Sequence, residues 1–382
     1  MTDRRVQSLP VRDTLRDYSR DSYVRGGSRS GACDTTPDLA THVIDCASGV
    51  FEFEPSALVV RALGEIDVHR LAAYTPLAVE SRLKQAILHR FRTPGVGDHQ
   101  LFLGHGSFNL LERIIHKVLR PTVLVGVGPQ FSEVPSEFLA AGGRYQSFPL
   151  AAPDASLPLA ALESALGAGG LSAVYLDNPN NPLGRTFDLE TIDRLASSCD
   201  RSAAALLVDE AFGDYVDDEK SAIQLLPRHR NLIVVRSFSK ALGLAAERIG
   251  YVFMSTDMAK RYREIDVPFE PGLVAQTLAV AAMSDHGWIE RVRVDARQAK
   301  ARIVAALADT GVQVLPTHPD VAIMALHRPG HDLWCELRTQ GIVALAGSSF
   351  ARTHADWDDS YCRLRVMRGD QLDLLCSKLA AL

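Results

Sequence analysis

The chain has 382 residues, of which 47% are hydrophobic and 23% charged, and its formal net charge is −5 at pH 7. This length exceeds one ordinary hydrophobic core and predicts a soluble globular protein with two domains. Because charges of both signs are dispersed, nothing indicates a nucleic-acid or membrane partner. The cysteines, at positions 33, 46, 199, 335, 362 and 376, show no metal-ligand spacing. We therefore expect no metal site and a reduced, cytoplasmic compartment.

The first 40 residues are rich in Arg, Asp, Ser and Gly and show no hydrophobic period. They carry charges every few positions, so we expect no secretory signal there. One interpretation is a mobile arm, and the alternative is a segment that folds over a neighbouring subunit or site.

From about residue 81, helical and strand patterns alternate. Helical spacing occurs in "ESRLKQAILHRF", "FNLLERIIHKVL", "VPSEFLAAGG" and "LETIDRLASSCD", and strand patterns occur in "HQLFLGHG", "TVLVGV", "SAVYLDNP", "AALLVDEA" and "NLIVVRSFS". This alternation predicts an α/β fold with a mostly parallel sheet covered on both faces. In such sheets, ligands bind outside the carboxyl ends of the strands.

A second pattern follows from about residue 272. A long helix is predicted to about residue 309, then short strands such as "VAIMAL" and "YCRLRVM", then a terminal helix. These elements are typical of a smaller α+β domain. We therefore expect an arm at 1–42, a large domain at 43–271 whose first part can pack on the small domain, and a small domain at 272–382.

Polar residues that could take part in binding or catalysis follow two of the apolar strands. Asp209 ends the buried strand "AALLV", where a carboxylate needs a cationic partner. That partner is either a neighbouring helix or a protonated ligand nitrogen. Strand "AVYL" opens into "DNPNNPLG", which is either a rigid turn or a platform that presents Asn181 to a ligand oxygen.

Two further stretches suggest an anion site. In "GHGSFNLLERII", Gly106 and Ser107 precede a helix whose N-terminus favours an anion, although the motif alone is weak. In "SFSKALGLAAERIG", Ser237, Ser239 and Arg248 can bind a phosphate. A desolvated lysine beside this cluster, at position 240, would have a lowered pKa and act as a nucleophile. The alternative is an ordinary solvated lysine at a helix start.

Together these stretches meet the needs of pyridoxal phosphate: a phosphate anchor, a carboxylate for the ring nitrogen and a lysine for the aldehyde. At this point the sequence resembles the fold-type I pyridoxal-phosphate enzymes, the aspartate aminotransferase superfamily. It is most similar to the class I/II branch that contains histidinol-phosphate aminotransferase. The matching segments are "GHGSFNLLERII", "NPNNPLGR", "VDEAFGDY" and "SFSKALGLAAERIGY", and the resemblance extends from about residue 43 to the C-terminus.

The resemblance implies a role for each matching residue. Lys240 would be the Schiff-base lysine that moves the substrate α-proton, Asp209 would pair with the pyridine nitrogen, and Asn181 would donate to the phenolic oxygen of the ring. The remaining cofactor contacts would come from Gly106, Ser107, Phe108, Ser237, Ser239 and Arg248 at the phosphate and Phe131 over the ring, although Phe131 could also be an ordinary core residue.

Two further roles concern the partner subunit and the substrate. Tyr74 would reach the phosphate in the partner subunit, which implies a homodimer with shared sites. Arg365 aligns with the arginine that binds the substrate α-carboxylate, and Arg363 is the second choice.

Four departures from the family pattern lie near the substrate. Phe212 replaces a tyrosine that bonds the phenolic oxygen, Leu183 replaces a threonine, and Asp320 replaces an asparagine before a small-domain strand. The loop "NENPxGPS" appears here as "DCASGVFEFEPS", without either asparagine. Cofactor residues are kept while substrate surroundings differ, which favours a specialised biosynthetic enzyme.

The leading hypothesis is therefore an aminotransferase for an amino acid or a similar amine. The alternative is a cyclase, lyase or decarboxylase that uses the same cofactor chemistry. A non-catalytic regulator is a more remote alternative, because the 40-residue arm is too short to resemble a DNA-binding domain.

Overall fold

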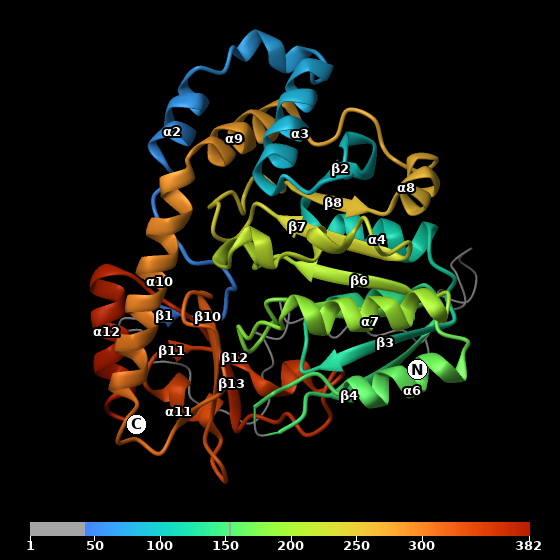
Figure 1. The fold of residues 1–382 in the computed structure, drawn as a ribbon. Coiled ribbons are helices and arrows are strands. Elements are labelled where there is room, and N and C mark those ends of the chain that lie inside the picture. The colour runs from blue at the N-terminus through green and yellow to red at the C-terminus, as the bar shows by residue number, and fades with distance from the viewer. Residues whose placement is uncertain (1–42, 153) are drawn as a thin grey trace, which may run out of the picture.

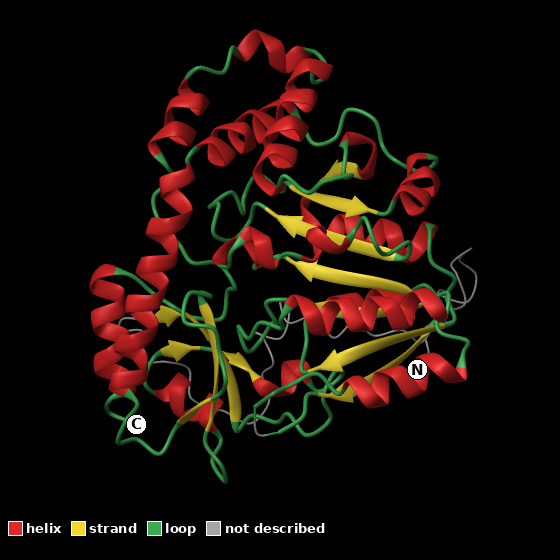
Figure 2. Ribbon diagram, viewed as in Figure 1, coloured by secondary structure: helices red, strands yellow, loops and turns green. Residues whose placement is uncertain are grey.

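The computed structural model describes residues 43–152 and 154–382 (Figures 1 and 2). The expected arm at 1–42 lies outside the described residues. No helix among the described residues is both long and apolar enough to cross a membrane.

A seven-stranded sheet forms the centre of the larger part of the molecule. Its spatial order is β2-β8-β7-β6-β5-β3-β4, and β8 runs antiparallel to both neighbours while β7, β6, β5, β3 and β4 run parallel. The strands span Leu101–Gly104 (β2), Val123–Gly128 (β3), Arg144–Pro149 (β4), Ala173–Asp177 (β5), Ala205–Glu210 (β6), Leu232–Ser237 (β7) and Gly250–Met254 (β8). The predicted α/β fold with a mostly parallel sheet is confirmed.

Helices cover both faces of this sheet, which explains why its central strands are wholly apolar (Figure 1). Along β6, Leu206 and Val208 belong to one core together with residues of α6 and α7, while Leu207 belongs to a second core with residues of α4 and α5. The helices of this part span Ala57–Gly64 (α2), Leu77–Phe91 (α3), Gly106–Lys117 (α4), Glu133–Ala140 (α5), Leu159–Ala168 (α6), Leu189–Arg201 (α7), Thr256–Arg263 (α8) and Leu273–Ser284 (α9).

The smaller part is built on an antiparallel sheet of order β12-β13-β10-β9. Beside it, β1 (Ile44–Asp45) pairs in parallel with β11 (Ile342–Val343), so the first described residues join the small part. Its other elements span His286–Ala306 (α10), Gln313–Val314 (β9), Ile323–His327 (β10), Leu333–Thr339 (α11), Leu345–Ala346 (β12), Tyr361–Arg365 (β13) and Gly369–Leu379 (α12).

The long helix expected from residue 272 is two helices, separated at Asp285. The Asp285 side chain accepts a hydrogen bond from the N–H of Trp288 at 3.2 Å and so caps the start of α10. Helix α9 packs on α2 and α3, whereas α10 runs on to the small sheet (Figure 1). This packing favours a boundary at Asp285 rather than at residue 272, and the domain division itself stays a prediction.

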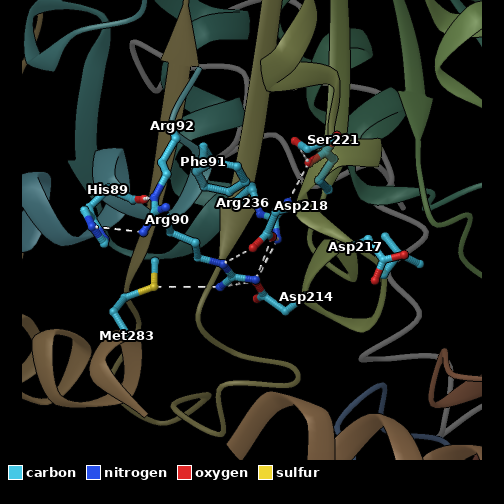
Figure 3. Close-up of polar contacts among 12 residues, drawn as sticks. His89, Arg90, Phe91, Arg92, Asp214, Asp217, Asp218, Ser221, Arg236 and Met283 are labelled. Atoms are coloured by element: carbon cyan, nitrogen blue, oxygen red, sulfur yellow. Dashed lines mark hydrogen bonds and ion pairs between the residues drawn. The ribbon is translucent and has the colours of Figure 1, made fainter. Parts of the chain in front are cut away.

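A buried ion-pair network joins the carboxyl ends of β6 and β7 (Figure 3). Arg236 pairs with Glu210 at 2.8 Å and with Asp214 at 2.7 Å, and these three side chains are at most 2% exposed. From α3, Arg90 pairs with the same Asp214 at 2.8 Å and with Asp218 at 2.7 Å. Although burial opposes ionisation, Arg90 and Arg236 hold the pKa of Asp214 below its usual range. The network thus fixes the residues directly beside Asp209 and Ser237.

The substitution Arg236→Met should destabilise the protein by about 3–5 kcal/mol, because it leaves the buried Glu210 without its cation and Asp214 with Arg90 alone. Urea unfolding monitored by circular dichroism measures the change. The matched control is Arg194→Met at the exposed Arg194–Glu163 pair, where the unfolding midpoint should barely move. Equal midpoints for the two variants would contradict a structural role for the network.

Candidate active site

Three neighbouring parallel strands end in polar residues, and the sequence singled out two of them, Asp209 and Ser237. Asp177 ends β5 and pairs in register with Asp209 of β6, and β7 ends beside them at Ser237. These ends border a cavity of about 490 Å³ that is also lined by Lys240 and Arg248. The cavity therefore lies where an α/β sheet is expected to bind a ligand.

Lys240 follows β7 and extends its amine into this cavity. Its Nζ lies 4.9 Å from the centre of the Phe212 ring. Burial and the nearby charge of Arg363 lower its pKa from 10.5 to about 7, with Asp209 opposing the shift and Arg248 adding to it. Lys240 is half-buried and turns rather than a helix follow it, which argues against an ordinary solvated lysine at a helix start. The lowered pKa favours a neutral, nucleophilic amine near pH 7.

A second buried lysine shows why the cavity matters. Burial also lowers the pKa of Lys300 to about 7. However, its Nζ donates to the hydroxyl of Thr317 and to the carbonyls of His318 and Ile323, all at 2.8–2.9 Å. Lys300 therefore links α10 to the loop before β10 and to the first residue of that strand. Lys240, in contrast, lines the cavity.

Asp209 is 5% exposed and accepts two hydrogen bonds from the protein. The hydroxyl of Tyr175 donates to Oδ2 at 3.2 Å, and the N–H of Ala211 donates to Oδ1 at 2.9 Å. Burial raises its pKa to about 6. A protonated ring nitrogen beside this carboxylate would favour its charged form.

The start of α4 faces Arg248 across a narrow gap. His105, at the N-cap position, forms no side-chain capping bond. A Cβ on Gly106, whose φ is +82°, would lie 2.9 Å from Nη2 of Arg248. Glycine therefore lets the guanidinium lie against the helix N-terminus, and both groups attract an anion.

Two serine hydroxyls complete this anion site. Arg248 Nη1 donates to the hydroxyl oxygen of Ser239 at 3.4 Å, and the Ser239 N–H donates to the hydroxyl oxygen of Ser237 at 3.1 Å. Both serines line the cavity together with Ser107 and Phe108.

Phe131 also lines the cavity, and its ring packs edge-on against Phe108 with centroids 6.1 Å apart. The structure therefore brings the predicted phosphate residues and the predicted ring-covering residue together.

Asn181 lies on the other side of the cavity, at the NPNNP turn. Its Oδ1 accepts a hydrogen bond from Nη1 of Arg363 at 3.0 Å, which leaves the amide nitrogen as a donor. Arg363 also donates to the carbonyl of Ala47. Its charge acts on Lys240, so this guanidinium stands beside the reactive amine.

The sequence preferred Arg365 over Arg363 for the substrate carboxylate, and which of the two binds it stays a prediction. Arg365 is 4% exposed and donates to the carbonyls of Asp45 and Val50 and to the carboxylate of Glu52, at 2.6–2.8 Å. These bonds commit its guanidinium to the first described segment, while Arg363 lies beside Asn181.

Tyr74 lies outside the cavity. Its side chain is 77% exposed, and its ring stacks on Phe269 with centroids 4.5 Å apart. Within one chain it therefore contributes nothing to the site.

Two residues at the site escaped the sequence reasoning. Asp177 accepts the N–H groups of Phe131 and Asn181 at 3.1 and 3.0 Å, and burial raises its pKa to about 7. The argument that singled out Asp209 applies equally to this carboxylate at the end of a buried strand. Gly49, which lines the cavity near Lys240, carries no such signal.

The donors around the cavity fit pyridoxal phosphate. An uncapped helix N-terminus, two hydroxyls and Arg248 suit a phosphate, Asp209 suits a protonated ring nitrogen, and Lys240 suits an aldehyde. No group of three or more His, Cys, Asp or Glu residues in the described part of the chain could hold a metal ion.

Comparison with known proteins identifies the family. Residues 41–379 match the family model of aminotransferase class I and II. Histidinol-phosphate aminotransferase of Shouchella clausii is 25% identical over 347 residues, which cover 89% of this chain and 85% of the relative. The enzyme of that name from Moorella thermoacetica is 28% identical over 312 residues, covering 81% and 78%.

Solved structures agree at the level of the fold. Histidinol-phosphate aminotransferase of Sinorhizobium meliloti in complex with pyridoxal-5'-phosphate superposes with a TM-score of 0.78 at 23% identity, covering 99% of this chain and 96% of that one. Aspartate aminotransferase of Thermus thermophilus with maleate gives 0.77 at 17% identity, covering 90% and 92%. This chain therefore belongs to the aminotransferase class I and II family, and it is a pyridoxal-phosphate-dependent aminotransferase of fold type I.

Proposed function

We propose that Lys240 is the residue that binds the cofactor aldehyde and moves the substrate α-proton during amino transfer from an α-amino acid. The observation that carries this proposal is the buried amine of Lys240, whose pKa of about 7 lets it both release and accept a proton at neutral pH. When bound, pyridoxal phosphate supplies a ring that withdraws electrons from the substrate α-carbon.

The other side chains bind and orient. Asp209 would hold the proton on the ring nitrogen, and the Tyr175 and Ala211 donors fix the direction of its carboxylate. Arg248, the two serine hydroxyls and the start of α4 would hold the phosphate. Asn181, whose Oδ1 accepts from Arg363, would donate its amide N–H to the phenolic oxygen.

We assign the substrate α-carboxylate to Arg363. A planar guanidinium binds a carboxylate through two parallel hydrogen bonds. Asn181 and Ala47 orient this guanidinium next to the amine of Lys240. The α-carbon of a substrate held there would lie within reach of the lysine.

The substrate of this chain is proposed to differ from that of its named relatives. The segment 46–56, where the sequence departs from the family loop, contributes Ala47, Ser48, Gly49 and Val50 to the cavity lining. We therefore propose an amino acid or a similar amine as the substrate, in a specialised biosynthetic pathway.

We further propose a homodimer with shared sites, located in the cytoplasm. Tyr74 belongs to an exposed apolar surface over α2, the 3₁₀ helix η3 (Val68–Ala72), the start of α3 and the loop at Phe269. Its large exposed side chains are Val60, Leu63, Val68, Leu71, Tyr74, Leu77 and Phe269, each at least 47% exposed. Apolar patches of this kind mark interfaces, and a second copy would bring Tyr74 to the partner's phosphate.

Amino transfer itself can be tested with labelled donors. Protein given a ¹⁵N-labelled amino acid and an unlabelled keto acid should form the labelled amino acid of that keto acid, detected by mass spectrometry. The substitution Lys240→Ala should slow this transfer by at least about 10²–10⁴-fold, because it removes the positioned proton carrier. The control Lys260→Ala, at a lysine 67% exposed on α8, should leave the rate unchanged.

Other products would favour the alternatives. Release of ammonia or carbon dioxide without a new amino acid would indicate a lyase or decarboxylase. Full activity in Lys240→Ala would remove the lysine from the mechanism.

The assembly is tested by mixing two inactive variants, Tyr74→Ala and Lys240→Ala. A mixed dimer places both substitutions in one site and leaves the other site intact. In an equal random mixture about half of the dimers are mixed, so activity should recover to roughly a quarter of the wild-type value. Mixing without recovery, or a monomeric mass in sedimentation equilibrium, would contradict shared sites.

A further inference from the structure

Asp177 ends β5 and lines the cavity, yet none of the roles proposed above involves it. Its side chain is 3% exposed. A buried carboxylate is costly unless hydrogen-bond donors surround it. The donors around Asp177 come from two different loops, so its bonds join parts of the site that are separate along the chain.

One oxygen of Asp177 connects two residues of the site. Its Oδ2 accepts the backbone N–H of Phe131 at 3.1 Å and the backbone N–H of Asn181 at 3.0 Å. Phe131 lies in the loop after β3 and Asn181 lies in the turn after β5, the strand that neighbours β3 in the sheet. The backbone of the predicted ring-covering residue is therefore tied to the backbone of the residue proposed for the phenolic oxygen.

Asn180 joins the same two loops at a second point. Its Nδ2 donates to Oδ1 of Asp177 and to the carbonyl of Pro129, both at 2.9 Å. Its Oδ1 accepts the N–H of Leu183 at 3.2 Å within the turn. Because Asn180 is 1% exposed, these bonds are shielded from water and hold the loop and the turn in one arrangement.

We infer that Asp177 is a positioning residue that sets the separation between Phe131 and Asn181. The inference rests on the roles predicted for Phe131 and proposed for Asn181. A planar ring can pack against Phe131 and accept a hydrogen bond from Asn181 at the same time only when the two residues are held at a fixed separation. Asp177 therefore acts on the binding of the pyridine ring and leaves the phosphate site unaffected.

The first test measures binding to cofactor-free protein by calorimetry. The probes are 4-deoxypyridoxine 5′-phosphate, which has the ring, the phenolic oxygen and the phosphate but no aldehyde, and inorganic phosphate. Asp177→Asn and Asp177→Ala both remove the charge, but only asparagine keeps an oxygen that can accept the two N–H groups. Asp177→Ala should therefore bind the ring compound at least about 10-fold more weakly than Asp177→Asn. Both variants should bind inorganic phosphate with the same Kd.

Two results would overturn the inference. One is equal binding of the ring compound by the two variants, and the other is an equal loss of phosphate binding in Asp177→Ala.

Asn178→Ala is the matched control for general loosening of the turn. Asn178 is also buried, and its side chain bonds the N–H and the carbonyl of Phe187 at 2.8 and 3.3 Å. The substitution should lower the thermal unfolding midpoint and leave binding of the ring compound unchanged. Weakening of the ring compound equal to that in Asp177→Ala would show that any damage to the turn suffices, which would contradict a positioning role.

The visible spectrum of the holoenzyme provides a second readout. A donor at the phenolic oxygen favours its charged form and so lowers the pH midpoint at which the bound cofactor loses its proton. If Asp177 positions Asn181, the midpoint in Asp177→Ala should lie about one to two pH units above that in Asp177→Asn. Equal midpoints in these two uncharged variants would refute the inference.

A third variant covers the case in which Asp177→Ala does not fold. Asp177→Ser, whose short hydroxyl can satisfy one of the two N–H groups, should fall between the wild type and complete loss of ring binding. Folded Asp177→Ser that matches Asp177→Asn in both readouts would contradict the inference. Wild-type protein that binds the ring compound but transfers no amino group would refute the proposed function and keep the inference.

Discussion

The desolvation of the Lys240 amine is the constraint on which the rest of the site depends. A buried ammonium is costly, so the amine is shifted toward its neutral form, and the nearby guanidiniums of Arg363 and Arg248 reinforce the shift. Asp209 opposes it, and this carboxylate is the group assigned to the ring nitrogen. In the proposed assignment, one set of charges would therefore serve three purposes: it would activate the lysine, anchor the phosphate and attract the substrate carboxylate.

Holding these charges in place requires a rigid frame behind them. The pairs of Arg236 with Glu210 and Asp214 tie together the ends of β6 and β7, directly beside the residues that face the cavity. Since isolated buried charges are expensive and paired ones need good geometry, such a network stabilises a single arrangement of the strand ends. On the opposite side, Arg365 performs the same task for the segment that carries Gly49. The reactive lysine thus lies between two anchored surfaces.

Much of this was accessible from the sequence because the signals are local. Apolar strands alternating with amphipathic helices predict the parallel sheet, and polar residues at strand ends, such as Asp209 and Asn181, predict the edge that binds a ligand. The choice between Arg363 and Arg365 was not accessible. The two lie two residues apart on one strand, so periodicity places them on the same face, and only the contacts with Asn181 and Glu52 distinguish the surroundings of the two guanidiniums.

Other features depend on tertiary packing in the same way. The break at Asp285 is a single capping residue inside a continuous helical pattern. Gly49 joins the cavity wall only because chain folding brings Lys240 and Phe212 to it. Lys300 shows that burial is not sufficient for a reactive lysine. Burial lowers its pKa to about 7 as well, but its amine is bonded to three protein oxygens and does not line the cavity.

The contrast between the two buried lysines provides the most direct measurement. Cofactor-free protein is mixed with pyridoxal phosphate at a series of pH values, the adduct is reduced with borohydride, and the modified peptide is identified by mass spectrometry. The account predicts attachment at Lys240, with a rate that rises up to about pH 7 and then levels off, because only the neutral amine reacts. Attachment at Lys300, or a rate at Lys240 that keeps rising toward the ordinary lysine pKa of 10.5, would contradict it.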